Sequence, residues 1–262
     1  MKRAEKKLLF FPEEPGQNKV ESMKKNVAVI FAGGTGMRMN TVSRPKQFLE
    51  LNGKPIIIYT LELFDNHPQV DGIVVVCIES WIPFLQKQLN KFEISKVGIV
   101  VSGGETGQES IYKGLLAARE KYGDECNVLI HDGVRPLIKE QTISDCIAQT
   151  NEKGNCVTCV PATETFIVKQ ADGSLEIPSR PDSLIARAPQ CFKLKDILDA
   201  HEKARSEGRN DFIDSCTMMS HYGHKIHTII GPMENIKITT PTDFFIFRAM
   251  VEVHENQQIF GF

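Results

Sequence analysis

Short, continuous apolar runs alternate along this chain with segments that are apolar on one side only. Runs of this length, rich in Val and Ile, are typical of strands buried on both faces of a parallel sheet, and the intervening segments have the spacing of amphipathic helices. The order β-α-β-α predicts an α/β protein whose mostly parallel sheet carries helices on both faces. The predicted strands are 27–32, 72–78, 97–101, 127–132 and 155–160, and the predicted helices are 56–64, 81–92 and 109–121.

The alternation changes between Val157 and Arg187. Here two strand-like runs flank Ala171-Asp172-Gly173-Ser174, and Asp-Gly between such runs is a hairpin signal. We expect a β-hairpin arm at about 157–187, which either folds on its own domain as an edge hairpin or pairs with a second subunit. The elements expected after it are helices at 194–206 and 212–221, a strand at 226–230 and a last helix from about Pro241. No linker or repeat divides the sequence, so a single domain over 23–262 is expected.

Composition and charge narrow the possible partners. The chain has 262 residues, of which 41% are hydrophobic and 24% charged, and its formal net charge is −2. This balance gives no electrostatic reason to expect a nucleic acid or an anionic membrane as a partner, and no apolar run approaches the ~20 residues of a transmembrane helix. The charged segment 1–22 has only a brief apolar patch, too short for a signal-peptide core, so we expect a mobile leader.

The seven cysteines indicate a cytoplasmic protein, because they are odd in number and scattered through apolar segments, as reduced thiols are. Cys156 and Cys159 form a Cys-x-x-Cys within a predicted strand. Residues three apart on a strand face opposite sides, so a shared metal ion is not expected there.

A glycine-rich loop follows the first predicted strand. It reads Ala32-Gly33-Gly34-Thr35-Gly36, and Arg38 and Lys46 come after it. Glycines allow backbone N–H groups to approach phosphate oxygens, and the two cations can neutralise a triphosphate. The P-loop spacing is absent, and a dinucleotide fingerprint starting at Gly34 fails at Met39. The loop indicates a nucleotide-phosphate cradle; the alternative is a plain strand-turn-helix connection with two solvated cations.

Polar residues meet this loop at one edge of the predicted sheet. Ligands of parallel sheets bind beyond the carboxyl ends of the strands, a rule that brings 33–36, 103–110 and 132–135 together. Asp132 ends a strand and suits Mg²⁺ as a hard oxygen ligand, or else it caps the next helix and pairs with Arg135. His131 beside it is interpreted as a hydrogen-bonding residue of the strand end rather than a catalyst.

Two later residues each allow two interpretations, one structural and one functional. Lys237 is either an exposed lysine of a strand or a countercharge for phosphate. Asp214 is either the N-cap of a helix or a contact to substrate hydroxyls.

Four further motifs follow the glycine-rich loop in order. They are Ser102-Gly103-Gly104-Glu105 with Ser110, His131-Asp132-Gly133-Val134-Arg135-Pro136, Ala188-Pro189-Gln190-Cys191-Phe192 and Asn235-Ile236-Lys237-Ile238-Thr239-Thr240-Pro241. Over about residues 25–250, the chain resembles the cytidylyltransferases that act on 2-C-methyl-D-erythritol 4-phosphate or D-ribitol 5-phosphate. The resemblance implies a Rossmann-like fold, CTP and Mg²⁺ as co-reactants, and a homodimer in which the arm reaches the neighbour's active site.

The resemblance also implies roles for individual residues. Those expected to hold CTP are Ala32, Gly33, Gly34, Thr35 and Gly36 at the triphosphate and base edge, and Gly104, Glu105, Ser110 and Gly133 around cytosine. Asp132 would carry the metal ion. The residues expected to stabilise charge at the α-phosphate, and so to be catalytic, are Arg38, Lys46 and Lys237. The expected contacts to the polyol phosphate are Asp132, Arg135, Thr163, Thr165 and Asp214.

The chemistry of this reaction suits such residues. A phosphate monoester is a competent nucleophile near neutral pH, so its attack on the α-phosphorus of CTP requires no general base. Both reactants are anions, so the protein must supply position and positive charge.

Two positions depart from the family's usual pattern. Gly107 stands where the family generally has arginine, and Thr163 stands where the methylerythritol branch usually has a cation for the substrate phosphate. A neutral Thr163 resembles the ribitol-phosphate branch, as do Pro45-Lys46-Gln47-Phe48 and Ile213-Asp214-Ser215-Cys216. We therefore expect D-ribitol 5-phosphate as substrate and CDP-ribitol, for a cell-wall or capsular polymer, as product. The alternatives are the methylerythritol enzyme of isoprenoid synthesis, a hexose-1-phosphate nucleotidyltransferase and a non-enzymatic nucleotide sensor.

Overall fold

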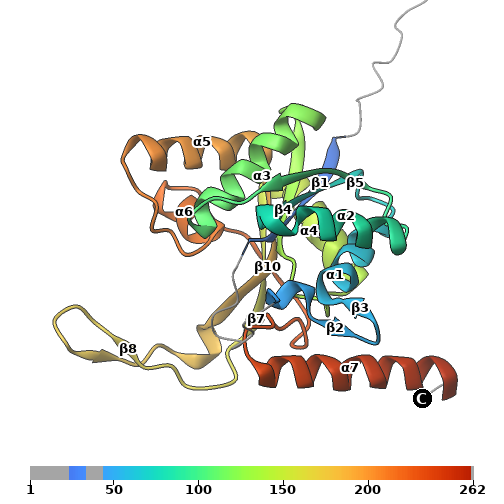
Figure 1. The fold of residues 1–262 in the computed structure, drawn as a ribbon. Coiled ribbons are helices and arrows are strands. Elements are labelled where there is room, and N and C mark those ends of the chain that lie inside the picture. Colours follow the sequence, from blue (N-terminus) through green and yellow to red (C-terminus); the bar gives the residue numbers. More distant parts are fainter. Residues whose placement is uncertain (1–23, 34–43, 261–262) are drawn as a thin grey trace, which may run out of the picture.

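A seven-stranded sheet forms the centre of the computed structural model, which describes residues 24–33 and 44–260. Its strand order is β11-β7-β10-β6-β1-β4-β5 (Figure 1). Neighbouring strands are parallel, except that β10 is antiparallel to both β6 and β7. The bounds of the strands are β1 Lys25–Ala32, β4 Gly72–Cys77, β5 Val97–Ser102, β6 Cys126–Asp132, β7 Asn155–Pro161, β10 Leu184–Lys193 and β11 Thr228–Ile230. The prediction of a mostly parallel sheet is confirmed.

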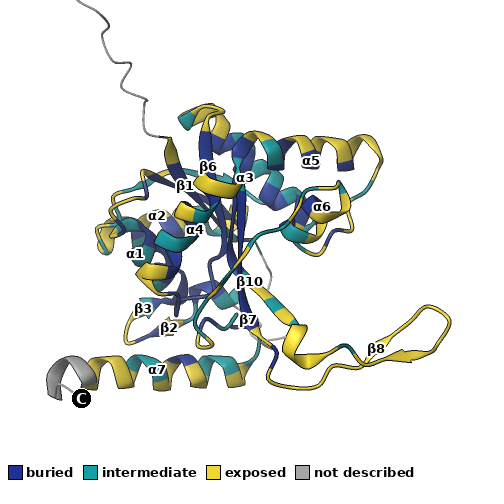
Figure 2. Ribbon diagram, turned by 180° about the vertical axis from the view of Figure 1, so that it is seen from behind, coloured by how far each residue is buried: buried dark blue, intermediate teal, exposed yellow. Residues whose placement is uncertain are grey.

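Helices cover both faces of the sheet, as the sequence predicts (Figures 1 and 2). Alternate residues of β1 enter different cores, because Val27 and Val29 pack on one face while Ala28 and Ile30 pack on the other. The helices of the first face are α3 Gly107–Tyr122, α5 Leu194–Ser206 and α6 Ser215–His221, and those of the second are α1 Ile56–Asp65, α2 Ile82–Lys91 and α4 Glu140–Lys153.

Helix α3 lies unusually close to the sheet. A Cβ atom at Gly114 would come within 2.7 Å of side-chain atoms of Val29 and Val76, so only glycine fits there. Thr106 caps the helix by accepting a hydrogen bond from the Glu109 backbone N–H at 3.1 Å. The start of α3 is thereby fixed at the carboxyl edge of the sheet.

The last helix, α7 (Pro241–Phe260), packs across a separate, smaller core. Phe247 is its fully buried anchor, whereas Phe245 is 65% exposed. No helix in the described part of the chain is long and apolar enough to cross a membrane. The remaining short elements are β2 Glu50–Leu51, β3 Lys54–Pro55, β8 Val168–Lys169, β9 Leu175–Glu176 and the 3₁₀ turns Lys46–Phe48, Glu79–Trp81 and Arg180–Asp182.

The predicted arm is present and projects from the molecule. Between β7 and β10, residues 162–183 extend away from the sheet and almost all of them are exposed (Figure 2). The two strands expected at its tip are present as β8 and β9, but each is only two residues long. In the turn between them Gly173 has φ +86°, and Asp172 Oδ1 accepts a hydrogen bond from Ser174 N. The arm does not fold back as an edge hairpin of its own sheet.

Two of the longer elements of the structure are absent from the sequence prediction. Helix α4 was not expected because its buried side chains include Thr142 and Thr150, which weaken the apolar periodicity. Strand β10 was not expected because Pro189 interrupts it, and proline is rare inside a strand. A register shift between Ala186 and Gln190 accommodates that proline. The predicted helix at 212–221 begins later, at Ser215.

Candidate active site at the carboxyl edge of the sheet

A buried carboxylate forms the centre of the site. Asp132 ends β6 and is only 5% exposed. Its Oδ2 accepts a hydrogen bond from Arg135 Nε at 2.7 Å, and its Oδ1 lies 2.5 Å from Lys237 Nζ. Burial by itself would raise the pKa of Asp132, but attraction to Lys237 and Arg135 outweighs it and lowers the pKa to about 2. The carboxylate is therefore ionised at neutral pH.

The loop after β11 carries Lys237 to this carboxylate. The carbonyl of Asn235 accepts a hydrogen bond from Arg135, the side-chain amide of Asn235 donates to Ala188 O at 2.6 Å, and Ile238 N donates to Val134 O at 2.9 Å. Of the two alternatives for Lys237, the exposed lysine of a strand is wrong, because residues 235–240 form no strand and Lys237 is paired with Asp132.

The predicted cytosine loop is organised around one hydroxyl. Ser110, on the first turns of α3, is 5% exposed; its Oγ donates to Thr106 O at 2.9 Å and accepts from Gly104 N at 2.9 Å. A Cβ atom at Gly33 would lie 3.5 Å from that oxygen, so the end of β1 and this loop meet at Ser110. Glycine is required at position 104, since a Cβ there would collide with Glu109.

The end of β1 is also joined to the segment after β6 and to the turn that begins at Lys46. Gly133 N donates to Phe31 O at 3.0 Å, and a Cβ at Gly133 would be 3.3 Å from that of Ala32. Gln47, which is 1% exposed, donates its side-chain amide to the Ala32 carbonyl. Gly33 at the end of β1, the loop 103–110 and the segment 132–135 therefore meet at one edge of the sheet.

A cavity of about 310 Å³ opens beside Asp132. Its charged lining consists of Arg135, Arg187 and Lys237 and of the carboxylates Asp132 and Asp214. Apolar side chains complete the wall, and Ile213 at the rim is 93% exposed. Cations from three separate segments thus surround a space of a size suited to a small anionic ligand.

Asp214 is an N-cap, and it also lines this cavity. Its Oδ1 accepts from Thr217 N at 2.9 Å at the start of α6, while its Oδ2 accepts from Gln190 Nε2 at 3.3 Å. Burial by itself would raise the pKa of Asp214, but these hydrogen bonds outweigh it and lower the pKa. The capping role is confirmed, and the contact to substrate hydroxyls stays a prediction.

Other predicted site residues lie elsewhere. Glu105 is exposed and lines a different cavity with Arg205 and Arg209, which residues of α3 and α5 share. Thr163 and Thr165 are exposed on the arm and do not line the cavity of their own chain. The predicted phosphate-cradle residues Gly34, Thr35, Gly36 and Arg38 lie outside the described residues, as does the leader 1–22.

Sequence reasoning missed two residues of the cavity wall. Gln190 belongs to the quoted Ala188–Phe192 motif but was given no role, and Arg187 immediately precedes that motif. A cation next to a family motif was the signal that could have identified Arg187.

Two expectations about non-catalytic residues are confirmed. His131 is fully buried and its Nε2 lies 3.2 Å from Arg135 O, while burial lowers its pKa to about 4, so the ring is neutral at pH 7. Cys156 and Cys159 enter opposite cores of the sheet and cannot share a ligand.

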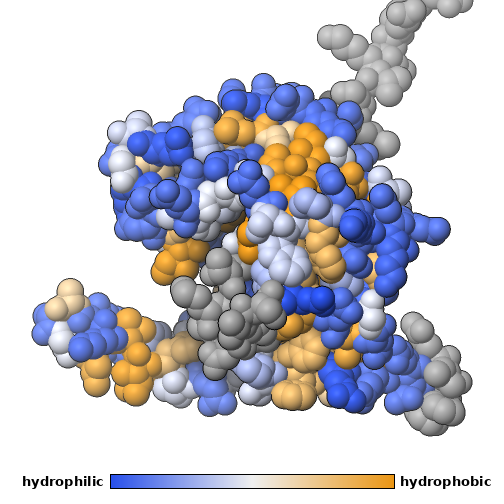
Figure 3. Space-filling model, in the orientation of Figure 1, coloured by the Kyte–Doolittle hydropathy of each residue, from blue (hydrophilic) through white to orange (hydrophobic). Residues whose placement is uncertain are grey.

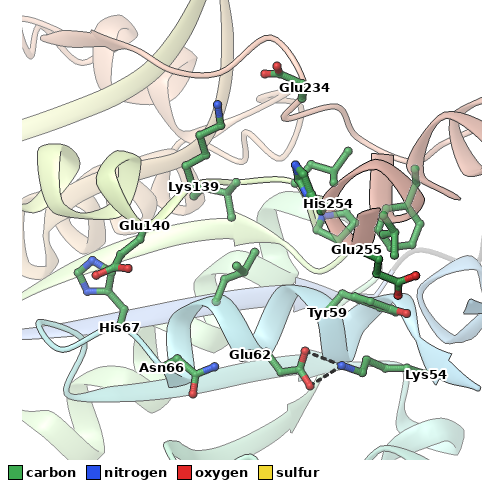
Figure 4. Close-up of a pocket in the computed structure, with 16 residues that line it drawn as sticks. Lys54, Tyr59, Glu62, Asn66, His67, Lys139, Glu140, Glu234, His254 and Glu255 are labelled. Carbon is green, nitrogen blue, oxygen red and sulfur yellow. Dashed lines mark hydrogen bonds and ion pairs between the residues drawn. The ribbon is translucent and has the colours of Figure 1, made fainter. Parts of the chain in front are cut away.

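A second cavity, of about 540 Å³, lies between α1, residues 136–140 and α7 (Figure 4). Its cations and anions are mixed, with Lys54 and Glu62 paired at 2.8 Å, and none of the predicted site residues lines it. The cavity beside Asp132 has the chemistry that the sequence predicts; this one does not.

The residues present fit a magnesium ion that is shared with a bound nucleotide. Among the described residues, no three His, Cys, Asp or Glu side chains converge as a complete cage. Mg²⁺ usually takes one or two carboxylates and completes its octahedron with phosphates and water. The ionised Asp132 supplies one such carboxylate, because Arg135 and Lys237 occupy one lone pair of each oxygen and leave the other lone pair for the ion.

A doubly covered α/β sheet with cations and a carboxylate at its carboxyl edge agrees with the predicted nucleotidyltransferase. The sequence model of the family described as "IspD: 2-C-methyl-D-erythritol 4-phosphate cytidylyltransferase" matches residues 26–253, and the chain belongs to this family of cytidylyltransferases. The expectation of a cytidylyltransferase is confirmed.

Relatives within the family carry two different names. A ribitol-5-phosphate cytidylyltransferase of Vibrio parahaemolyticus is 50% identical over 90% of this chain and 100% of its own length. One of Streptococcus agalactiae serotype III is 48% identical over 90% of this chain and 99% of its own. A 2-C-methyl-D-erythritol 4-phosphate cytidylyltransferase of Clostridium botulinum is 37% identical over 88% of this chain and 99% of its own.

A solved structure shares the fold. The 4-diphosphocytidyl-2C-methyl-D-erythritol synthase of Anaerococcus prevotii superimposes with a TM-score of 0.73 at 24% identity, covering 87% of this chain and 96% of that one.

Proposed function

We propose that this enzyme transfers the cytidylyl group of CTP to D-ribitol 5-phosphate, giving CDP-ribitol and pyrophosphate. The observation that carries the choice of substrate is the difference in similarity: four relatives named for ribitol 5-phosphate are 48–50% identical and a fifth is 38% identical, while three named for methylerythritol phosphate are 37% identical. The neutral Thr163 on the arm supports the same choice.

In the proposed reaction, a phosphate oxygen of ribitol 5-phosphate forms a bond to the α-phosphorus of CTP. The bond from that phosphorus to the oxygen shared with the β-phosphorus breaks, and pyrophosphate leaves with its electron pair. Lys237 lies beside Asp132 at the cavity, where its ammonium group can offset the charge of the α-phosphate as the two anions approach. Arg135 is held rigidly by Asp132 and Asn235 and offers its positive charge to the same space.

The predicted CTP contacts follow the same arrangement. Gly33, Gly104 and Ser110 meet at the end of β1, which supports these three residues as parts of one nucleotide site. Arg38 and Lys46 are proposed as further cations for the phosphates. Mg²⁺, when bound, would neutralise phosphate charge, and Asp132 is the residue that would hold it.

We also propose a homodimer in the cytoplasm. The arm carries exposed apolar side chains, among them Ile167 at 63%, Leu175 at 66% and Ile177 at 65%, and apolar patches are visible along it (Figure 3). A second copy would cover these side chains and bring Thr163 and Thr165 to its own cavity. All seven cysteines are free thiols, which supports a reducing compartment.

Pyrophosphate release from CTP and Mg²⁺ with each polyol phosphate tests the choice of substrate. We expect kcat/KM for ribitol 5-phosphate to exceed that for 2-C-methyl-D-erythritol 4-phosphate by roughly 100-fold, because a pocket shaped for a linear polyol loses contacts with a shorter, branched one. Unphosphorylated ribitol and UTP serve as controls for the phosphate and for the base. A preference for the branched substrate would refute the choice of ribitol 5-phosphate and leave the cytidylyltransferase class standing.

A further inference from the structure

Arg187 has no carboxylate partner among the described residues, and it lines the cavity beside Asp132. Its NH1 donates to the Asn235 carbonyl at 3.0 Å, and its Nε is buried with no hydrogen-bond partner. The other two cations of the cavity, Arg135 and Lys237, are both paired with Asp132. Arg187 is thus the cavity cation whose charge is not compensated within the described chain.

The backbone explains how Arg187 comes to face the cavity. Strand β10 pairs with β7 through Ala186 and again from Gln190, and the three residues between them have no partner in this ladder. Pairing with β6 begins only at Gln190. Such interruptions commonly redirect side chains next to functional sites. The position of Arg187 therefore follows from the same irregularity that accommodates Pro189.

Leaving a guanidinium group partly buried without a counter-ion is unfavourable, since burial disfavours the charged form. Burial, and then the nearby Arg135, indeed lower the pKa of Arg187. Both effects are relieved if an anion enters the cavity and accepts hydrogen bonds from the free face of the guanidinium. A phosphate monoester suits that face, because its planar N–H donors match two phosphate oxygens.

We infer that Arg187 binds the phosphate group of the acceptor substrate, leaving one phosphate oxygen free to attack. The inference rests on the proposed function for the identity of that substrate. It also accounts for the neutral Thr163: the cation that holds the acceptor phosphate comes from β10 and not from that position of the arm. Arg187 is in this sense a determinant of acceptor affinity, distinct from the cations that neutralise the α-phosphate.

The test is a comparison of wild type with Arg187→Gln and Arg187→Lys in full steady-state kinetics, with CTP and ribitol 5-phosphate varied separately. We expect Arg187→Gln to raise KM for ribitol 5-phosphate by roughly 30- to 100-fold, with kcat and the KM for CTP changed by less than about threefold. Arg187→Lys should recover part of the affinity because it retains the charge. Inorganic phosphate should compete with ribitol 5-phosphate on wild type and do so much more weakly on Arg187→Gln.

Arg119→Gln, an exposed substitution on α3, is the matched control for removal of a cation. An unchanged KM for ribitol 5-phosphate in Arg187→Gln would overturn the inference, and so would an equal rise in both KM values. Failure of the wild type to use ribitol 5-phosphate would instead count against the proposed function, and the inorganic phosphate competition can then be repeated against whichever acceptor is active.

Discussion

At the scale of single residues, the site is a compact set of opposite charges. Asp132 is nearly fully buried, and it remains ionised because Lys237 and Arg135 each occupy one of its oxygens. Lys237 is itself 40% exposed, so its ammonium group can also face the cavity. One lysine therefore stabilises the carboxylate and, in the proposed reaction, also offers its charge to a substrate.

Replacing Lys237 by Gln removes that charge with little change in side-chain length. We expect kcat to fall by roughly 10²- to 10³-fold, the usual effect of losing one preorganised group that stabilises charge in the transition state. The pKa of Asp132 should also rise, because its largest attractive partner is gone. Pyrophosphate release and urea unfolding would measure the two effects.

The unfolding experiment has a defined pH window. A carboxyl whose pKa is depressed on folding stabilises the protein above its unfolded value near 4, and that contribution is lost as pH falls toward about 2. In Lys237→Gln the pKa of folded Asp132 should lie closer to its unfolded value, so the pH range over which this stability is lost should be narrower. Lys87→Gln, on the exposed face of α2, should alter neither measurement. A Lys237→Gln enzyme with normal kcat would exclude a catalytic role.

At the scale of elements, what the sequence predicts depends on how local the signal is. The strands β1, β4, β5 and β6 were predictable from their continuous Val and Ile runs, which are a local pattern. The meeting of the segments that follow β1, β5 and β6 was predictable from the edge rule for parallel sheets. Strand β10 was not, because its pairing with β6 and β7 overrides a proline within it. The place of Arg187 at the cavity depends on that pairing, so it was not predictable from the sequence either.

Lys237 illustrates the same limit within the site. Its motif was evident, but its partner Asp132 lies far away in sequence, and only the hydrogen bonds of Asn235 bring the two segments together. From the sequence alone, both interpretations of Lys237 therefore stayed open: an exposed lysine of a strand and a countercharge for phosphate.

The first turn of α3 joins the predicted cytosine loop to the segment before α6. Gln108, which is 7% exposed, donates to Arg209 O at 3.0 Å and accepts from Phe212 N at 3.2 Å. These two bonds hold the segment 209–212, which leads directly to Asp214 at the cavity. Gln108 is therefore a positioning residue for this wall of the site.

The substitution Gln108→Met keeps the volume but leaves two backbone groups without partners. We expect it to lower the free energy of unfolding by about 1–3 kcal/mol and to raise KM for the polyol phosphate more than KM for CTP. Gln86→Met, an exposed position on α2, should change stability by less than about 0.5 kcal/mol. Urea unfolding and steady-state kinetics report both quantities. Unchanged stability and KM values in Gln108→Met would show that these hydrogen bonds do not position the segment.

At the scale of the whole molecule, the arm is the part that its own chain leaves uncovered. Isolated two-stranded hairpins are marginally stable in water, and the strands β8 and β9 contribute only two residues each. Nevertheless the arm is long and its apolar side chains are exposed (Figures 2 and 3). A second copy of the chain that covers the arm would remove these apolar side chains from water.

Replacing Ile167, Leu175 and Ile177 together by Ser should therefore convert a dimer to a monomer in sedimentation equilibrium. If each arm also reaches the neighbour's cavity, the monomer should lose activity even though Asp132, Arg135 and Lys237 are untouched. Ile230→Ser on the edge strand β11, which is 60% exposed, is a control for the loss of surface apolar area. Because dimerisation follows mass action, wild-type activity per chain should fall on dilution below the dissociation constant, while the triple variant should show a constant low activity. A wild type that is monomeric and fully active at every concentration would rule out the shared site.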